Sequence, residues 1–348
     1  MAVLIRPIDM SRRVAARVTG RIHTLPILAL SVHSACNCRC VMCDIWKANA
    51  DKREIAVLTL DRHMHAIRRL HVRRVMFTGG EPLLHSNFWA FCERLRAEGI
   101  LLSLVTTGLL IEPHAARIAQ LMDEVVISID GDAPTHDAIR RVRDGFARIA
   151  RGVTMLRSQP HTPMLIARSV VQRSNFRSLA ATIRAVEELG VDRLSFLAAD
   201  VTSPAFNRPE PWSAERQREV ALSRDDLPML VEAIRWAEEK CAATLASGFV
   251  EGGVASLRRI YDHYAALAGV REWPAVRCNA PWVSAVVEPN GVVRPCFFHA
   301  AYPQTSSELD GVINSPQAID FRRTLDVRTN ETCKRCVCTL SLPLRGRV

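Results

Sequence analysis

Short apolar runs alternate with longer amphipathic stretches along the first 200 residues, and this alternation restricts the possible folds more than any other feature. The apolar runs predict six β-strands, at Leu28–Val32, Arg74–Thr78, Leu101–Thr106, Glu124–Ile129, Pro163–Val171 and Arg193–Leu197. Apolar residues spaced three and four apart predict the helices between them, at Leu60–Leu70, Phe88–Glu98, Glu112–Leu121, Ile139–Leu156 and Leu179–Leu189. Strand–helix repeats in this order predict an α/β fold whose parallel sheet curves into a partial (β/α)6 TIM-like barrel. In such barrels the reactive groups lie where the strands end.

The rest of the chain has a different pattern. Three prolines between residues 204 and 211 interrupt it, and helical stretches follow at Leu227–Leu245 and Val254–Leu267. Apolar runs at Trp282–Glu288 and Val292–Phe297 flank Pro289-Asn290-Gly291, a strong signal for a β-hairpin. We therefore expect four parts: an N-terminal helical arm at 1–26, the barrel at 27–200, a helical insert or linker at 201–275 and a C-terminal cysteine module at 276–348.

The formal net charge of +10 is concentrated at the two ends of the chain. Residues 1–34 carry five Arg and one acid, and residues 321–348 carry seven Lys or Arg and two acids. The middle is close to neutral and only 6% of residues are aromatic, so we expect no nucleic-acid partner. The Arg-rich start has two interpretations, an organelle transit peptide or an amphipathic helix, and we favour the helix.

No apolar run reaches the roughly 20 residues that span a bilayer, and the N-terminus lacks the apolar stretch of a secretory signal. We therefore expect a cytoplasmic protein without a membrane partner. Eleven cysteines in a reducing compartment favour metal binding over disulfides. Cys92 and Cys241 lie among apolar neighbours in helical patterns, and we expect both to be buried packing residues.

Three cysteines follow the first predicted strand with the spacing C-x3-C-x2-C, at Cys36, Cys40 and Cys43. Three thiolates can hold three irons of a cubane cluster and leave the fourth iron open to a chelating ligand, whereas zinc sites use four closed ligands, often in C-x2-C pairs. This spacing, with the following Asp44-Ile45-Trp46-Lys47, resembles the signature of the radical S-adenosylmethionine (radical SAM) superfamily. The resemblance implies a catalytic [4Fe-4S] cluster that binds S-adenosylmethionine. Met42 stands where that signature usually has an aromatic residue, and we interpret the surplus Cys38 as a packing residue.

The second predicted strand ends in Gly79-Gly80-Glu81-Pro82, which resembles the GGEP motif of the same superfamily. The resemblance implies that these residues bind the methionine amino group of S-adenosylmethionine, because two glycines permit close backbone approach. Taken alone, the four residues are also typical of an ordinary turn. Thr107, at the end of the third predicted strand, occupies a position where the superfamily often has Asn, and it has an equally good interpretation as a turn residue.

After the fourth predicted strand, Ser128, Asp130 and Arg140 resemble a Ser-x-Asp-Gly motif with an Arg twelve residues after the Ser. The resemblance implies that Ser128 and Arg140 contact the carboxylate or ribose of S-adenosylmethionine, since an Arg offers paired donors to a carboxylate. The alternative for Arg140 is an exposed charge on a helix. Asn175, after the fifth predicted strand, is a further family-like position.

Five cysteines lie near the C-terminus: Cys278, Cys296, Cys333, Cys336 and Cys338. Their spacing resembles the SPASM and twitch extensions of radical SAM enzymes, and the small number of cysteines favours the single-cluster, twitch-like form. The resemblance implies one auxiliary [4Fe-4S] cluster held by the first four, with Cys338 as the competing or spare ligand. A zinc ribbon on the same four thiolates is the alternative.

Together these motifs predict an enzyme that cleaves S-adenosylmethionine to a 5′-deoxyadenosyl radical and abstracts hydrogen from a substrate C–H bond. The auxiliary cluster would assist an oxidation or bond formation in the biosynthesis of a small metabolite or natural product. A second hypothesis is maturation of a ribosomally made peptide by cross-linking or epimerisation, although residues 1–26 are too few for a separate leader-binding domain. A third is a non-catalytic iron–sulfur or zinc scaffold. The resemblance also implies a flavodoxin- or ferredoxin-type electron donor.

Overall fold

The computed structural model describes residues 7–344, and its centre is a single eight-stranded sheet. The strands follow the order β6-β5-β4-β3-β2-β1-β7-β8, and β1 to β6 are all parallel. The strand bounds are β1 Ile27–His33, β2 Arg74–Gly79, β3 Leu101–Thr106, β4 Glu124–Ser128, β5 Met164–Val171, β6 Arg193–Ala198, β7 Ser284–Val287 and β8 Val293–Arg294. The six predicted strands and the parallel α/β barrel are confirmed.

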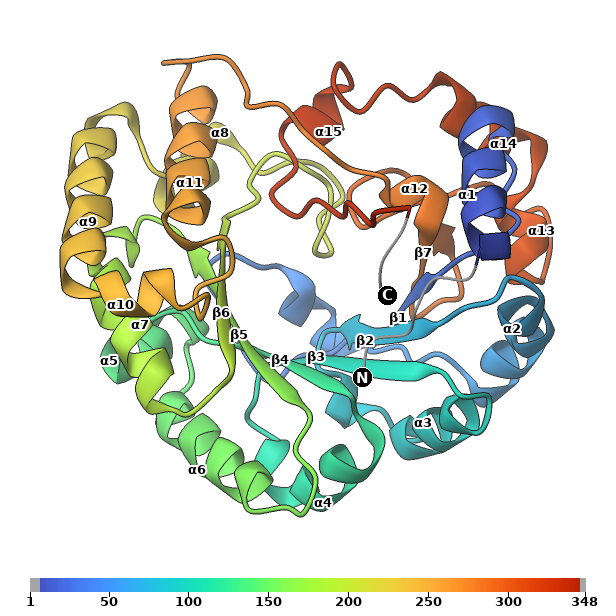
Figure 1. Ribbon diagram of the computed structural model, residues 1–348, viewed down its shortest axis with the longest axis horizontal. Helices are drawn as coiled ribbons and strands as arrows, with labels where there is room; N and C mark the ends of the chain where they lie inside the picture. Colours follow the sequence, from blue (N-terminus) through green and yellow to red (C-terminus); the bar gives the residue numbers. More distant parts are fainter. Residues whose placement is uncertain (1–6, 345–348) are drawn as a thin grey trace.

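Helices cover the outer side of the curved sheet (Figure 1). In the barrel and before it they are α1 Pro7–Thr19, α2 Val57–Arg69, α3 Phe88–Ala97, α4 Ile111–Leu121, α5 Ala133–Arg140, α6 Gly145–Arg157 and α7 Leu179–Glu188. Beyond the barrel they are α8 Ala214–Val220, α9 Leu227–Lys240, α10 Ala242–Ala246, α11 Gly253–Leu267, α12 Ala280–Val283, α13 Leu309–Ile313, α14 Pro316–Thr324 and α15 Glu331–Lys334. Short 3-10 turns lie at Ile45–Asp51, Pro82–Leu84, Phe176–Ser178 and Arg224–Asp226. The predicted N-terminal helical arm corresponds to α1 from residue 7, and its first six residues lie outside the described part.

Successive side chains of a strand point to opposite faces of the sheet. Each strand therefore directs one set of side chains at the helices and the other set into the barrel interior. Leu28, Val75 and Leu102 are fully buried in the main core, as are Ile127 and Ala167. The interior-facing positions are more polar, which leaves hydrogen-bonding groups inside the barrel. Inside the barrel, for example, Arg74 of β2 donates to the Ser103 hydroxyl of β3 at 2.6 Å.

The single helix predicted over Ile139–Leu156 is wrong, since the structure has two helices there. Asp132 caps α5 by accepting from the Thr135 amide, and the helix ends at Arg141, whose φ of 53° is left-handed. Asp144, with φ of 55°, precedes α6. Apolar spacing continues through this break, so periodicity alone could not show it. A smaller break at Cys241 divides the predicted Leu227–Leu245 helix into α9 and α10.

The C-terminal hairpin is joined to the barrel sheet. The predicted Asn290-Gly291 turn connects β7 with β8, which are antiparallel, and Gly291 has a φ of +82°. β7 also pairs in parallel with β1, from Ile27 opposite Ser284 to Leu30 opposite Val287. The hairpin prediction is confirmed, but Trp282 and Val283 belong to the helical turn α12, and β8 ends at Arg294 rather than at the predicted Phe297. Through β7, the cysteine module is therefore joined to β1, the strand that leads into the cysteine triplet.

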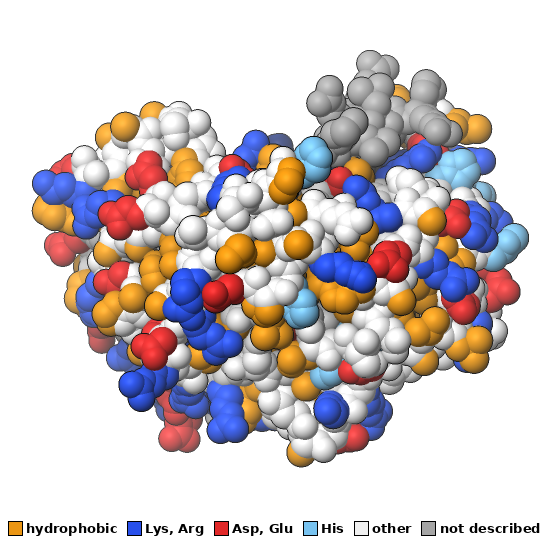
Figure 2. Space-filling view, turned by 90° about the horizontal axis from the view of Figure 1, so that it is seen from below, with side chains coloured by type: hydrophobic (Ala, Val, Ile, Leu, Met, Phe, Trp, Pro, Cys, Tyr) orange, Lys and Arg blue, Asp and Glu red, His pale blue; other side chains and the backbone are white. Residues whose placement is uncertain are grey.

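Charged side chains of both signs are interspersed on the face shown in Figure 2. Many surface arginines are paired with acids, such as Arg68 with Glu98 and Arg94 with Asp61. Pairs of this kind neutralise the positive charge locally. Within residues 7–344 no helix combines the length and the apolar character needed to cross a bilayer.

Candidate functional site

The loop after β1 brings the cysteine triplet to the carboxyl end of the barrel. Cys38 is 2% exposed, and the neighbouring Cys36 and Cys40, together with burial, raise its pKa. Cys38 and the positive charge of Arg140 lower the pKa of Cys40. The backbone amide of Ile45 donates to the Cys43 sulfur at 3.4 Å. Cys38 is thus a buried, protonated thiol between two candidate ligand sulfurs, as the packing interpretation requires.

Arg140 lies inside the protein, on the last turn of α5. Its Nε donates to the Asp130 carboxylate at 2.6 Å, and one terminal nitrogen lies 3.5 Å from the Cys40 sulfur. The carboxylate also accepts from the Val170 amide at 2.8 Å. The surface-charge alternative for Arg140 is therefore wrong. The guanidinium is directed at a cysteine sulfur and a carboxylate, both from its own chain, and not at an open binding surface.

Glu81 is fully buried at the end of β2, and its carboxylate accepts several hydrogen bonds. Thr107 donates through its amide and its hydroxyl, both at 2.8 Å, while Thr106 donates through its hydroxyl at 2.9 Å and Leu83 through its amide at 3.1 Å. Burial raises the pKa of Glu81, and these bonds oppose the rise. Glu81 and Thr107 thus hold the ends of β2 and β3 together, a role that the resemblance did not imply.

The two glycines before Glu81 allow close approach of backbone to backbone. A Cβ on Gly80 would lie 2.0 Å from the Ala35 carbonyl oxygen, and one on Gly79 would lie 2.5 Å from the His33 oxygen. In addition, the Gly80 amide donates to the His33 carbonyl at 2.7 Å. The glycines therefore let the GGEP segment pack directly against the start of the cysteine loop.

Two buried donors near this layer have no hydrogen-bond partner among the described residues: Asn37 Nδ2 and Arg168 Nε. The Asn37 side-chain oxygen lies 2.9 Å from the Thr107 hydroxyl, so the Asn37 amide lies beside the GGEP network. Arg168 lies on β5 directly opposite Ser128 of β4, on the interior side of the sheet. A buried donor without an acceptor costs about 1–3 kcal/mol, so both atoms indicate where a ligand with acceptor oxygens would bind. Sequence reasoning missed Arg168, whose only signal was a charge within an apolar strand.

Asn175 has a structural role. Its side-chain amide donates to the carbonyl oxygens of Asp130 and Val170, at 2.9 and 3.0 Å. Its own oxygen accepts from the Gln172 amide at 2.8 Å. These bonds join the ends of β4 and β5 and leave no free donor on Asn175 for a cofactor.

The five C-terminal cysteines lie near one another: Cys296, Cys333 and Cys336 are each close enough to at least two of the other four for their charges to raise its pKa. Burial raises the pKa of Cys296 to about 11, and the nearby backbone amides of Phe298 and His299 oppose the rise. It raises that of Cys333 to about 12. Cys338 is exposed, whereas Cys336 is only partly so and donates to the Cys338 carbonyl at 3.3 Å. Buried thiolates need a compensating positive centre, which a bound iron–sulfur cluster supplies.

Between residues 7 and 344, no three His, Cys, Asp or Glu side chains converge on a point suited to a single metal ion. A cubane cluster binds each thiolate through a different iron, so its ligands are spaced more widely than those of one ion. Both cysteine groups have the donor chemistry of such a cluster. Cys92 and Cys241 lie apart from both groups and are buried, as predicted.

The segment before α8 contacts the cysteine loop from the open side of the barrel. The indole of Trp212 donates to the Asp44 carboxylate at 2.7 Å, and Asn207 donates to the Asp44 carbonyl at 3.3 Å. Arg216 donates to the Val41 carbonyl, and its guanidinium lies over the Trp212 ring at 4.8 Å. We call residues 203–216 the strap. It fixes the position of the loop that carries Cys40 and Cys43.

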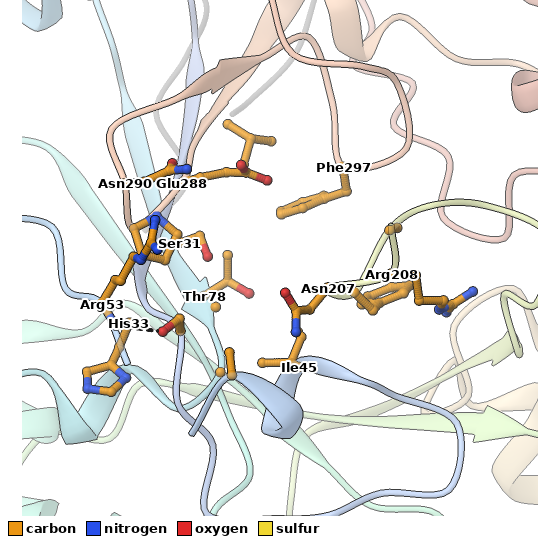
Figure 3. Close-up of a pocket in the computed structure, with 18 of the residues that line it drawn as sticks. Ser31, His33, Ile45, Arg53, Thr78, Asn207, Arg208, Glu288, Asn290 and Phe297 are labelled. Atoms are coloured by element: carbon orange, nitrogen blue, oxygen red, sulfur yellow. Dashed lines mark hydrogen bonds between the residues drawn. The ribbon is translucent and has the colours of Figure 1, made fainter. Parts of the chain in front are cut away.

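A cavity of about 530 Å³ opens between the ends of β1 and β2, the strap and the β7–β8 hairpin (Figure 3). Phe206 and Phe297 give it apolar surface, while Asn207 and Asn290 line it with amides. Each of its cationic side chains is matched by an acid. The pairs are Arg53–Asp51 at 2.9 Å, Arg294–Glu288 at 2.6 Å, Arg208–Asp200 at 3.2 Å and His33–Glu54 at 3.1 Å.

Family models match both the barrel and the cysteine module. Residues 30–186 match the model of the radical SAM superfamily, and residues 278–337 match that of an iron–sulfur cluster-binding domain, SPASM. The chain is 29% identical to the pre-heme d1 synthase of Dinoroseobacter shibae over 171 residues, which are 48% of this chain and 42% of that protein. It is also 29% identical to the mycofactocin maturase MftC of Mycolicibacterium smegmatis over 194 residues, 53% of this chain and 48% of that protein. The chain spans about half the length of the curated relatives it matches.

Two solved structures share the fold over most of the chain. AdoMet-bound anSMEcpe has a TM-score of 0.63 at 18% identity, covering 89% of this chain and 86% of that one. Streptococcus suis SuiB, bound to its precursor peptide SuiA, has a TM-score of 0.64 at 14% identity, covering 96% and 75%. From the two family matches and the position of its cysteines, the chain belongs to the radical SAM superfamily and carries a SPASM-type iron–sulfur cluster-binding domain.

Proposed function

We propose that this protein cleaves S-adenosylmethionine reductively and abstracts a hydrogen atom from a substrate C–H bond. The observation that carries the proposal is the position of Cys36, Cys40 and Cys43 at the carboxyl end of β1, packed against the GGEP segment. When bound, a [4Fe-4S] cluster and S-adenosylmethionine supply a 5′-deoxyadenosyl radical. A reducing cytoplasm with a flavodoxin- or ferredoxin-type donor would provide the electron.

Different residues of this chain would hold the cluster and the S-adenosylmethionine. Cys36, Cys40 and Cys43 would bind three irons, and Arg140 would stabilise the thiolate of Cys40 through its positive charge. Ser128 and Arg168 would bind the carboxylate of S-adenosylmethionine, since the unpaired Arg168 Nε faces the barrel interior. This assigns to Arg168 the role that the sequence suggested for Arg140.

We propose that a second cluster of the SPASM type binds to four of the five C-terminal thiolates, with Cys278, Cys296, Cys333 and Cys336 as its ligands. The exposure of Cys338, against the burial of Cys333, supports Cys338 as the spare thiol. The hairpin that carries Cys296 lies beside β1, and residues next to both cysteine groups, Ile45 and Phe297, line the cavity. Such a cluster would assist oxidation of a substrate held between the two groups.

The charge balance of the cavity favours a peptide as substrate. A nucleotide or a polycarboxylate needs unpaired cations, and every cation that lines this cavity is paired with an acid. Main-chain amides instead need neutral donors and acceptors, which Asn207, Asn290 and Thr78 provide. Phe206 and Phe297 can pack on an apolar side chain. These features support peptide maturation over conversion of an anionic metabolite.

The test is a turnover assay with anaerobically reconstituted protein, S-adenosylmethionine and dithionite, in which 5′-deoxyadenosine is quantified by mass spectrometry. We expect a slow basal rate that rises severalfold with a library of short synthetic peptides and is unchanged with nucleoside triphosphates. Stimulation by the triphosphates alone would contradict the peptide assignment. Absence of 5′-deoxyadenosine under every condition would contradict the proposed radical chemistry.

A further inference from the structure

We infer that His299 is a hydrogen-bond donor to the auxiliary cluster and raises its reduction potential. The inference rests on the proposed function, because it requires a cluster on Cys333. The Nε2 atom of His299 lies 3.3 Å from the Cys333 sulfur, although 34 residues separate them in sequence. Both side chains are buried, with exposed fractions of 9% and 7%.

The imidazole is held in this orientation from two sides. Its ring packs edge-on against Phe321 of α14, with centroids 5.1 Å apart. On the backbone side, Arg294 donates to the His299 carbonyl at 3.1 Å and pairs with Glu288 at 2.6 Å. The contact with Cys333 is therefore built into the hairpin and α14, rather than made by a freely rotating side chain.

The direction of the hydrogen bond follows from the chemistry of the sulfur. A thiolate that binds iron has no proton, so it can only accept, and Nε2 of His299 must then carry the hydrogen.

Donors of this kind act on the redox equilibrium of the cluster. Adding an electron makes the ligand sulfurs more negative, so a hydrogen bond stabilises the reduced state more than the oxidised state. Only the difference in the strength of this hydrogen bond between the two redox states shifts the potential. We expect removal of the His299 donor to lower the ratio of reduced to oxidised auxiliary cluster about tenfold at a fixed solution potential, which is 59 mV for one electron.

The experiment compares His299→Phe with His299→Gln in reconstituted full-length protein, by redox titration followed by electron paramagnetic resonance. Phe keeps the ring packing on Phe321 but has no donor, whereas Gln keeps a donor. We expect His299→Phe to retain its iron and to lower the ratio of reduced to oxidised auxiliary cluster about tenfold. His299→Gln should have a ratio closer to that of wild type. The catalytic cluster in the same sample is the internal reference and should not shift. His63→Phe replaces another buried histidine, one without a sulfur contact, and controls for the loss of a buried ring.

Each other result has a distinct meaning. Full iron with an unchanged auxiliary potential in His299→Phe would overturn the donor role. Loss of about four iron in both variants would overturn it too, because it would make His299 a ligand. If wild-type protein contains no auxiliary iron at all, the SPASM-cluster part of the proposed function fails, independently of His299. If His299→Phe does not fold, His299→Gln provides the test. A ratio of reduced to oxidised auxiliary cluster in His299→Gln that differs tenfold from wild type, with all the iron retained, would contradict the inference.

Discussion

Two arginines at the end of the barrel differ in what they pair with. Arg140 has an acid and a cysteine sulfur within reach, whereas Arg168 Nε has no partner in the described chain. A buried cation is tolerated only when its charge is compensated. Arg140 is therefore part of the fold and of the cysteine loop, while Arg168 is available for an anionic ligand. Sequence spacing could not distinguish them, because the distinction depends on which strands are neighbours.

We predict that Arg168→Gln weakens binding of S-adenosylmethionine about tenfold to a hundredfold, the effect of losing charge-assisted hydrogen bonds. Isothermal titration of the cluster-loaded protein measures it. Arg193→Gln is the matched control, since Arg193 also lies on a strand but is half exposed and 3.8 Å from Glu251. Equal affinity in the two variants would refute the assignment of Arg168.

His136 predicts a specific dependence of stability on pH. It is 1% exposed, and its Nδ1 accepts from the Asp130 amide at 3.3 Å. Burial, with a smaller effect of Arg140, lowers its pKa to about 3, so the folded state stays neutral where the unfolded state gains a proton. Stability contributed by this residue is therefore lost as the pH falls below about 6.5, by about 1.4 kcal/mol at pH 5.5.

The measurement is the free energy of unfolding by denaturant at pH 7.5 and pH 5.5. In His136→Asn, which keeps an acceptor but does not titrate, we expect the decrease between these values to be smaller by that amount. His161→Asn, at an exposed histidine, should leave the decrease unchanged. A decrease in His136→Asn as large as in wild type would show that the folded state protonates His136 without cost.

Among the elements, the strap forms the connection between the insert and the cysteine loop. Two of its residues, Phe206 and Asn207, have φ of 60° and 63°, a conformation that non-glycine residues adopt at some cost. The cost is offset by the bonds that Asn207 and Trp212 make to Asp44. We expect the strap to hold the cysteine loop in place when no cluster is bound.

Trp212→Phe is predicted to lower the free energy of unfolding by about 1–2 kcal/mol, because it removes one hydrogen bond to a buried carboxylate and keeps most of the ring. It should also speed proteolytic cleavage within residues 203–216. The control is Trp236→Phe on α9, whose ring is 52% exposed and lies under Lys240. Identical stability and cleavage in both variants would show that the strap does not depend on Asp44.

The sequence predicts some elements better than others, for physical reasons. Each barrel strand is a local apolar run, so its position could be predicted almost to the residue. The break between α5 and α6 was missed because Arg141 and Asp144 adopt left-handed backbone angles that neither residue type requires. The pairing of β7 with β1 is non-local, so no local pattern indicates it.

At the scale of the whole molecule, the spacing of the cysteine triplet and of the C-terminal cysteines was enough to propose them as cluster ligands. The residues that surround them could not be predicted. Cys36 and Cys296 lie 260 positions apart in the printed sequence, yet β1 and the β7–β8 hairpin are neighbours in one sheet. The roles of Glu81, Arg168 and His299 depend on contacts between distant segments. Because one sheet joins the two segments, a single cavity lies between the loop after β1 and the β7–β8 hairpin.

The central claim is that a cluster on the barrel cysteines cleaves S-adenosylmethionine, and a single comparison tests it. Wild-type protein and the triple variant Cys36→Ala, Cys40→Ala and Cys43→Ala are reconstituted separately under the same conditions, and iron and 5′-deoxyadenosine are measured in each. We expect about eight iron with 5′-deoxyadenosine in wild type, and about four iron with no 5′-deoxyadenosine in the variant. Production of 5′-deoxyadenosine at the wild-type rate by the triple variant would contradict the account.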